Sequence, residues 1–338
     1  MCAYTPRSSQ LRLLLVMPSH QLVRKGAEQG LRIWSLWDES ELEVEFAPRL
    51  EAVSEELLLT DFTDEAGLRD TVARTARRHD IDAVLHCGHG SSVLPVVREA
   101  SQLGLSPNPP AVYERLQSWE EGDRAPAEAP RVSVETLTVN GTHHVVGMTA
   151  QRTTGPPDFV VMGYLHPAPL TDDEQKIISA VVEERLTASG YRFGPAHTEV
   201  ALLPFGPRIV SCRPHLGADR IPLLIEIARG FDLEAAMFTA LLGDRPVVPK
   251  ASQYAELGFM LLPEGRLETY TGTEDIAVTP WVRGARFPYS AGDWIASIGD
   301  PRARRAYVVV EGSTPEVTRE RVAKARQDLV TEIRPTAR

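Results

Sequence analysis

The sequence predicts an α/β protein with a parallel α/β domain at the N-terminus, an antiparallel sheet with helices in the middle, and a small strand-rich domain at the C-terminus. Three observations predict this class. Apolar runs alternate with helical stretches as far as residue 103, turn residues join pairs of strands at 132–152 and 194–213, and strands outnumber helices after residue 246. A chain of 338 residues can form two or three such packed units.

The N-terminal domain begins with an apolar run, and a similar run precedes its first glycine-rich loop. Such runs are typical of buried parallel strands, and the stretches between them are typical of the helices that cover the sheet. In order, we expect a strand at 11–17, a helix at 22–36, a strand at 42–48, a helix at 64–79, a strand at 81–85 and a helix ending near 103. Parallel sheets bind ligands at the carboxyl ends of their strands. We therefore expect His20 and the loop at 86–92 to border a site.

The loop at 86–92 contains His86, Cys87, His89 and Ser91 between glycines. Glycine lets the backbone approach a ligand closely, and the N-terminus of the following helix favours an anion, so one interpretation is a site for a carboxylate or another anion. The two histidines with Cys87 are also compatible with zinc. The third interpretation is a turn with a structural role alone.

The middle of the chain carries clear turn and helix signals. Asn140-Gly141 predicts a hairpin between strands at 132–139 and 144–152. Thr171, Glu174 and Gly190 are the N-cap, capping-box and C-terminal signals of a helix at 171–189. The remaining expected elements are a strand at 158–165, a helix pair at 221–243, strands at 258–263, 267–271 and 305–311, and a last helix at 315–331.

A second hairpin, at 194–213, gathers the polar residues on which a function would depend. Alternate residues of a strand share a face, so His197 and Glu199 point the same way, as do Ile209, Ser211 and Arg213 on the second strand. The loop after the hairpin adds further polar side chains and a glycine, namely His215, Gly217, Asp219 and Arg220. The cluster is either a functional site or a solvated hairpin with ordinary charges.

Composition excludes several classes of partner. The formal net charge of −10 argues against nucleic acid and anionic membranes. No apolar run is long enough for a signal peptide or a membrane span. Three widely spaced cysteines give no disulfide framework, which favours the reducing cytoplasm. A homodimer is one option for the assembly, which the sequence does not fix.

The segment His197-Thr198-Glu199, followed by Gly206-Pro207, resembles the last catalytic hairpin of the ATP-grasp superfamily, in its carboxylate–amine ligase branch. The resemblance continues at 104–112 and 132–138, and the C-terminal domain is similar to the closing domain of the biotin-carboxylase-like enzymes. Three positions depart from the family pattern. In place of its second metal-binding glutamate, its metal-binding asparagine and its catalytic arginine, this chain has Ser211, Arg213 and His215.

The resemblance also implies that a subdomain is missing. In the family, a lysine-bearing and glycine-rich lid covers the nucleotide phosphates, but here residues 113–130 contain a short helix and a Pro/Ala/Glu linker instead. The chain has no lysine between residues 26 and 175, so the two phosphate-binding lysines have no counterpart. We expect a truncated ATP-grasp-like fold with an N-terminal domain at 1–112, a linker at 113–130, a remnant catalytic subdomain at 131–245 and a closing domain at 246–338.

Of the family's metal ligands, the resemblance leaves only Glu199, and an arginine at 213 would repel magnesium and attract a substrate carboxylate. We therefore expect no cofactor, and no metal unless Glu199 holds one. The expected catalytic residues are Glu199, His215 and His197. The expected residues for a small carboxylate or amino-acid-like substrate are Arg213, Arg220, Ser211, Glu135, His20, His86, His89 and Ser91.

These expectations lead to one main hypothesis and two alternatives. The main hypothesis is a biosynthetic enzyme, in keeping with secondary metabolism, that has lost ATP use and catalyses elimination, cyclisation, isomerisation, decarboxylation or hydrolysis by acid–base chemistry. The first alternative is an ATP-dependent carboxylate–amine ligase with an unusual lid, which needs ATP and magnesium. The second is a binding or regulatory protein without activity.

Overall fold

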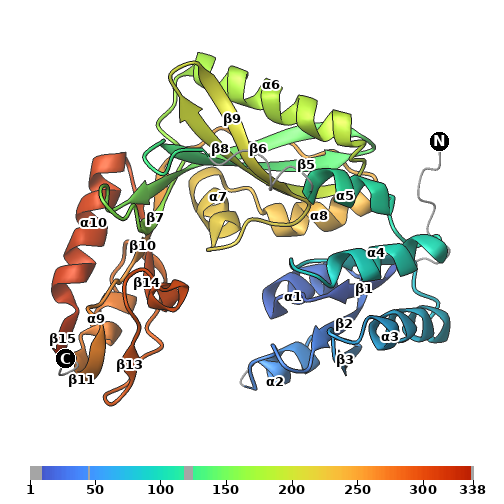
Figure 1. Ribbon diagram of the computed structural model, residues 1–338, viewed down its shortest axis with the longest axis horizontal. Coiled ribbons are helices and arrows are strands. Elements are labelled where there is room, and N and C mark those ends of the chain that lie inside the picture. The colour runs from blue at the N-terminus through green and yellow to red at the C-terminus, as the bar shows by residue number, and fades with distance from the viewer. Residues whose placement is uncertain (1–9, 45, 118–124, 336–338) are drawn as a thin grey trace.

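The computed structural model describes residues 10–44, 46–117 and 125–335, and these residues form a mixed α/β protein with three sheets. A parallel four-stranded sheet comes first along the chain, followed by an antiparallel eight-stranded sheet, and the strands of a three-stranded sheet alternate with the last strands of the eight-stranded one (Figure 1). This arrangement confirms the predicted fold class, with its parallel, antiparallel and strand-rich C-terminal parts.

The N-terminal sheet has the strand order β3-β2-β1-β4, and all of its pairs are parallel. Along β1, Leu13 and Leu15 face one core cluster and Leu14 and Val16 face the other, so both faces of the strand are buried. The strands are β1 Arg12–Val16, β2 Arg32–Asp38, β3 Glu56–Thr60 and β4 Ala83–His86. The helices are α1 His20–Glu28, α2 Ala47–Glu51, α3 Glu65–Arg78 and α4 Val93–Gln102.

Two predicted elements of this domain are wrong. The helix predicted at 22–36 ends at Glu28, because Gly30 adopts a left-handed conformation and β2 then pairs in register with β1. A strand that is buried on both faces shows no alternation of apolar and polar residues, so β2 could not be recognised from the sequence. The strand predicted at 42–48 is also wrong, because the residues described there form a turn and the start of α2.

The eight-stranded sheet has the order β12-β14-β10-β7-β6-β5-β8-β9 and forms the centre of the molecule. Helix α6 lies on one side of it and α7 and α8 on the other, which is the side toward the N-terminal domain (Figure 1). Its first five strands in chain order are β5 Arg131–Val139, β6 Thr142–Thr153, β7 Val161–His166, β8 Gly194–Leu203 and β9 Gly206–Arg213. The helices are α5 Pro110–Gln117, α6 Asp172–Ser189, α7 Ile221–Arg229 and α8 Leu233–Leu241.

The capping and turn residues of this region form the predicted helix ends and hairpin. The Thr171 hydroxyl accepts a hydrogen bond from the Glu174 amide while the Glu174 carboxylate accepts one from the Thr171 amide, and Gly190 ends α6 in a left-handed conformation. Asn140 and Gly141 also have positive φ and join β5 to β6. Part of the predicted linker, residues 118–124, lies outside the described residues.

The C-terminal part contributes to two sheets. Strands β10 Tyr254–Phe259, β12 Val282–Arg286 and β14 Tyr307–Gly312 extend the eight-stranded sheet beyond β7. Strands β11 Gly265–Thr271, β13 Trp294–Ile295 and β15 Val330–Arg334 form the small sheet, and the helices are α9 Thr273–Ala277, η1 Pro301–Arg305 and α10 Pro315–Asp328. The domain boundary at residue 246 stays a prediction, since one sheet crosses it. No helix of the described residues has both the length and the apolar character that a membrane crossing requires.

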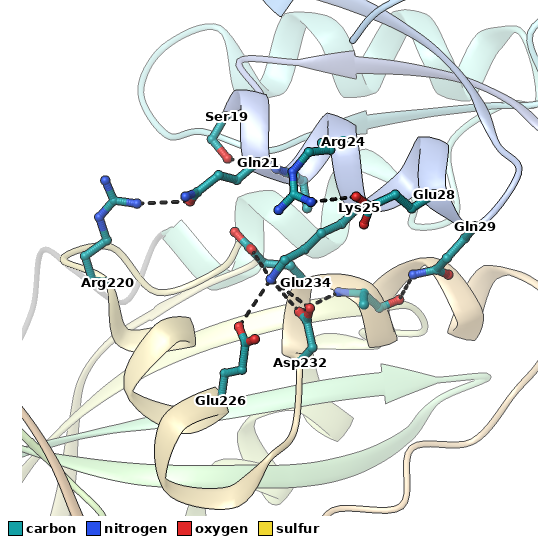
Figure 2. A network of polar contacts seen from close by, with 12 residues as sticks. Ser19, Gln21, Arg24, Lys25, Glu28, Gln29, Arg220, Glu226, Asp232 and Glu234 are labelled. Carbon is teal, nitrogen blue, oxygen red and sulfur yellow. Dashed lines mark hydrogen bonds and ion pairs between the residues drawn. The ribbon is translucent and has the colours of Figure 1, made fainter. Parts of the chain in front are cut away.

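Helix α1 joins the N-terminal domain to the central part through one lysine (Figure 2). The ammonium of Lys25 lies 2.8 Å from carboxylate oxygens of Asp232 and Glu234 and 3.4 Å from Glu226. Gly26 packs so closely that a Cβ there would lie 3.1 Å from the Phe238 ring. These contacts hold α1 against α7 and α8.

Candidate functional site

The hairpin β8–β9 and its neighbour β5 place two rows of polar residues on the face toward the N-terminal domain. In the first row, Glu135 pairs in register with His197, and His197 pairs with Arg213. In the second row, Glu199 lies between Ser133 and Ser211. Directly opposed residues of an antiparallel pair point to the same face, so each row is a line of neighbouring side chains.

His197 and Glu135 form a buried pair. The Nδ1–H of His197 donates to Glu135 Oε1 at 2.5 Å, and Glu135 is fully buried beneath the loop that contains Gly217. Burial alone would lower the pKa of His197, but the charge and the hydrogen bond of Glu135 outweigh it, and the pKa is raised. His197 is therefore held toward its cationic form.

His215 has the opposite electrostatic environment. Its Nδ1–H donates to the Leu216 carbonyl oxygen at 2.6 Å, and its Nε2 is buried without a hydrogen-bond partner among the described residues. Burial lowers the pKa of His215, and the neighbouring His197 and His89 lower it further. His215 is therefore held neutral, with a ring nitrogen that can accept a proton.

The loop after β4 reaches this histidine pair, as its position at a strand end predicted. The ring centroids of His89 and His215 are 6.1 Å apart, and those of His215 and His197 are 6.4 Å apart with nearly parallel planes. His86 makes a hydrogen bond through Nε2 with Ser92, at 3.0 Å, and burial lowers its pKa to about 3. Ser91 is exposed, and no contact of its hydroxyl with the histidines is seen.

Zinc does not fit this loop. Burial raises the pKa of the Cys87 thiol to about 12, so the thiol carries its proton when no metal is bound. Nowhere in 10–44, 46–117 or 125–335 do three His, Cys, Asp or Glu side chains gather in a way that could hold a metal. Of the interpretations given for loop 86–92, the anion site and the structural turn remain.

Glu199 is one-third exposed at the edge of the histidine pair. Its carboxylate lies 4.0 Å from His197 Nε2 and 3.9 Å from Arg131 Nη1. The hydroxyls of its row neighbours, Ser133 and Ser211, are buried and have no hydrogen-bond partner in the described structure. Magnesium prefers carboxylate oxygens, and this row offers one carboxylate beside an arginine.

Of the two arginines expected to bind substrate, one lies in the first row and the other lies at the start of α7. Arg213 is exposed next to His197 in the first row. Arg220 donates through Nη1 to Gln21 at 3.1 Å (Figure 2). It also donates through Nε to the Tyr307 hydroxyl at 2.8 Å, so it connects the three parts of the chain. His20 begins α1, and its pKa is lowered by burial and then by Arg49, Arg220 and Arg24. The positive charge around His20 favours an anion.

Two residues of this region, Tyr164 and Ser92, were not predicted from the sequence. Tyr164 donates its hydroxyl to Asp219 at 3.0 Å and so holds the loop after β9. Ser92, rather than Ser91, is the hydrogen-bond partner of His86. Gly217 covers Glu135, since a Cβ there would lie 2.8 Å from the carboxylate. The sequence carries no signal for Tyr164 or Ser92, whereas the family pattern had singled out Gly217.

Comparisons with known proteins agree with this architecture. Residues 258–334 match the model of the L-amino acid ligase C-terminal domain 2. An uncharacterized protein of Sinorhizobium fredii, y4rH, is 26% identical over 232 residues, which are 66% of this chain and 46% of that protein. This chain thus spans about half the length of the curated relative that it matches.

Solved structures align over nearly the whole chain. An L-amino acid ligase from Bacillus licheniformis has a TM-score of 0.79 at 17% identity, covering 98% of this chain and 100% of that one. A phosphoribosylglycinamide synthetase from Anaerococcus prevotii has a TM-score of 0.77 at 11% identity, covering 96% and 100%. A biotin carboxylase from Campylobacter jejuni has a TM-score of 0.66 at 10% identity, covering 95% and 92%. The chain therefore has an ATP-grasp fold of the carboxylate–amine ligase type, as its hairpin motif predicted.

Proposed function

We propose that this protein is an enzyme that binds a small carboxylate or amino-acid-like substrate and acts on it by general acid–base catalysis. His215 is the base, because its buried Nε2 has no partner in the described structure and its pKa is lowered. His197 is the acid, because Glu135 holds it toward the cationic form. Arg213 and Arg220 provide positive charge for the substrate carboxylate.

The observation that carries this proposal is the pair of opposite pKa shifts on two stacked imidazoles. Two titratable groups whose environments drive their pKa values apart are suited to the roles of acid and base in one site. The two imidazoles, whose ring centroids are 6.4 Å apart, have pKa values shifted in opposite directions by their surroundings. Glu199 borders His197 and is placed to bind an amino group or to exchange protons with the imidazole.

The experiment is a turnover screen with a matched pair of variants. The protein is incubated with α-amino, keto and hydroxy acids, with and without nucleotide, and products are detected by mass spectrometry. We expect His215→Asn to lower turnover at least about 100-fold, the typical size of a general-base contribution. His143→Asn, in the β5–β6 hairpin, is the control and should keep full turnover. Binding of acids without turnover under any condition would instead favour a binding protein.

ATP-dependent carboxylate–amine ligation is the second candidate, and the comparisons support it better than a nucleotide-free reaction. The family match covers the C-terminal domain of L-amino acid ligases, and the structural likeness to such a ligase extends over the whole chain. In such a reaction, His215 would remain the group placed to take a proton from the attacking amine.

The donor set around Glu199 does not fit a magnesium-bound nucleotide. The row holds one carboxylate between two serines, with Arg131 at 3.9 Å, and Lys25 is fully engaged by three carboxylates. Calorimetry with ATP and magnesium, followed by an ADP-release assay with pairs of amino acids, separates the two candidates. ADP release that depends on an amino acid would establish ligation, whereas turnover of an acid with no nucleotide present would exclude it.

A further inference from the structure

A second hollow lies away from the histidines, between residues 158–161, which lead into β7, and residues 297–304, which lead into β14. Its volume is about 580 Å³, whereas the cavity beside His215 measures about 30 Å³ and has room for about one water molecule. Sites for small organic molecules usually measure about 300–1,000 Å³. Of these two hollows, the one at β7 is large enough for such a ligand.

This pocket carries two opposite charges that form no ion pair within the part of the chain that the structure describes. Among the described residues, neither Arg304 nor Asp158 forms an ion pair, although both line the pocket. The third charged residue of the wall, Asp300, is already engaged, because its carboxylate accepts bonds from the Arg302 guanidinium at 2.6 and 3.1 Å. The Arg304 guanidinium lies 5.8 Å above the Phe259 ring, which holds it at the wall.

The rest of the lining is apolar or open backbone. Val160, Val161 and Ile298 provide an aliphatic surface, and Ile298 is 43% exposed although it is a large apolar residue. At Gly299 the backbone itself lines the pocket, and a Cβ at this position would have no other heavy atom within 4 Å. A cation, an anion and an aliphatic wall in one pocket match the three parts of an amino acid.

We infer that the pocket at β7 binds an aliphatic α-amino acid, with its carboxylate on Arg304, its ammonium on Asp158 and its side chain against Val160, Val161 and Ile298. This site goes beyond the proposed function, since none of its lining residues belongs to the histidine site. A chain of contacts connects the two sites. Arg304 lies over Phe259, the Phe259 ring meets the Tyr164 ring edge-on at 6.2 Å, and Tyr164 holds Asp219 of the loop that contains His215.

Isothermal calorimetry with three related molecules tests the assignment of each charge. The molecules are L-leucine, 4-methylpentanoate, which lacks the ammonium, and 3-methylbutylamine, which lacks the carboxylate. We expect L-leucine to bind most tightly. Arg304→Gln should weaken L-leucine and 4-methylpentanoate at least about tenfold, and Asp158→Asn should weaken L-leucine and 3-methylbutylamine by a similar factor. Arg305→Gln, an exposed arginine next in sequence and outside the lining, should change none of the affinities.

The variant His215→Asn distinguishes this inference from the proposed function. It should keep full L-leucine binding at the pocket at β7, even if it loses turnover. Loss of L-leucine binding in His215→Asn would place the amino acid at the histidines and overturn the assignment, as would an unchanged affinity in both Arg304→Gln and Asp158→Asn. Wild-type protein that binds no L-leucine at millimolar concentration would overturn it too. Asp158 is exposed, so its variant tests the pocket even if Arg304→Gln, which loses the stacking on Phe259, fails to fold.

Discussion

At the residue scale, the proposed chemistry depends on Glu135, a carboxylate with no exposed surface and one oxygen that lacks a partner in the described structure. A buried carboxylate is costly unless a cation is paired with it. His197 supplies that cation, so Glu135 acts on the substrate only through the imidazole and is a positioning residue. From the sequence, we expected Glu135 to bind substrate. Because it is buried, we propose instead that it positions His197.

Replacing Glu135 by Gln should therefore change the titration of His197. Without the negative charge, burial is the main influence left on the imidazole, and the pKa of His197 should fall below that of free histidine. NMR titration of the histidine Cε1 protons measures this directly. The alkaline limb of the pH–activity profile should move to lower pH, because the protonated acid is lost earlier. An unmoved His197 resonance would show that Glu135 does not control this group, whereas Glu128→Gln, remote and exposed, should leave the titration unchanged.

Gly217→Ala tests the cover over this pair. The new Cβ would lie 2.8–3.0 Å from both oxygens and the carboxyl carbon of Glu135, which cannot move because His197 and the sheet hold it. We expect the free energy of unfolding to fall by about 1–3 kcal/mol, the usual cost of overpacking, in urea denaturation. Gly299→Ala is the control, since a Cβ there meets nothing within 4 Å. Equal stability of the two variants would mean that the loop does not close over Glu135 as described.

At the element scale, α1 fixes the N-terminal domain against α7 and α8. Lys25 is 15% exposed, and removing its ammonium leaves three carboxylates facing one another (Figure 2). Removing one partner of a fully buried pair costs about 3–5 kcal/mol, but Glu226 is 43% exposed and water will screen part of the repulsion. We expect Lys25→Met to cost about 2 kcal/mol in urea denaturation, with faster hydrogen exchange in α1. Lys176→Met, at an exposed pair with Asp173, should cost less than about 0.5 kcal/mol.

Elements whose ends are marked by capping or turn residues were predictable from the sequence. Strands that form only by pairing with other strands were not. Helix α6 begins and ends at Thr171 and Gly190 because these residues bond their own backbone, which a sequence shows directly. Strand β3 has no such signal, since Glu56–Thr60 becomes a strand only by pairing with β2. The same holds for β13 and β15, which pair with β11 over long sequence distances.

The hairpin shows where the prediction of the candidate site fails. Strict alternation predicted that Ile209, Ser211 and Arg213 share a face. A bulge between Glu199 and Val200 in the pairing of β8 and β9 inserts one residue, so Ile209 enters the core with Cys212 while Ser211 keeps its place beside Glu199. The opposite pKa shifts of His197 and His215 could not be predicted from the sequence either. They are caused by burial and, for His197, by the buried carboxylate of Glu135.

At the scale of the whole molecule, buried neutral histidines make folding sensitive to acid. Burial lowers the pKa of His86 and of His166 to about 3, and it lowers the pKa of His215 as well. A group with a folded pKa below its unfolded value contributes stability that is present above the unfolded pKa and is lost as the pH falls toward the folded pKa. His197 has the opposite sign, since its raised pKa stabilises the fold at low pH and loses that contribution as the pH rises.

His166 offers the clearest test of this dependence, because it lies outside the proposed site and has no exposed surface. Arg229 donates to its Nε2 at 3.1 Å, so Nδ1 carries the proton and donates to the Thr149 hydroxyl at 3.0 Å. Between pH 6 and pH 4 the unfolded chain binds a proton at this residue and the folded chain does not, which should remove about 1.4 kcal/mol of stability per pH unit. In His166→Gln, which keeps an acceptor for Arg229, urea denaturation at several pH values should show a slope smaller by that amount. The slope, rather than the absolute stability, is the readout. A wild-type slope in His166→Gln would mean that His166 is already protonated in the folded protein.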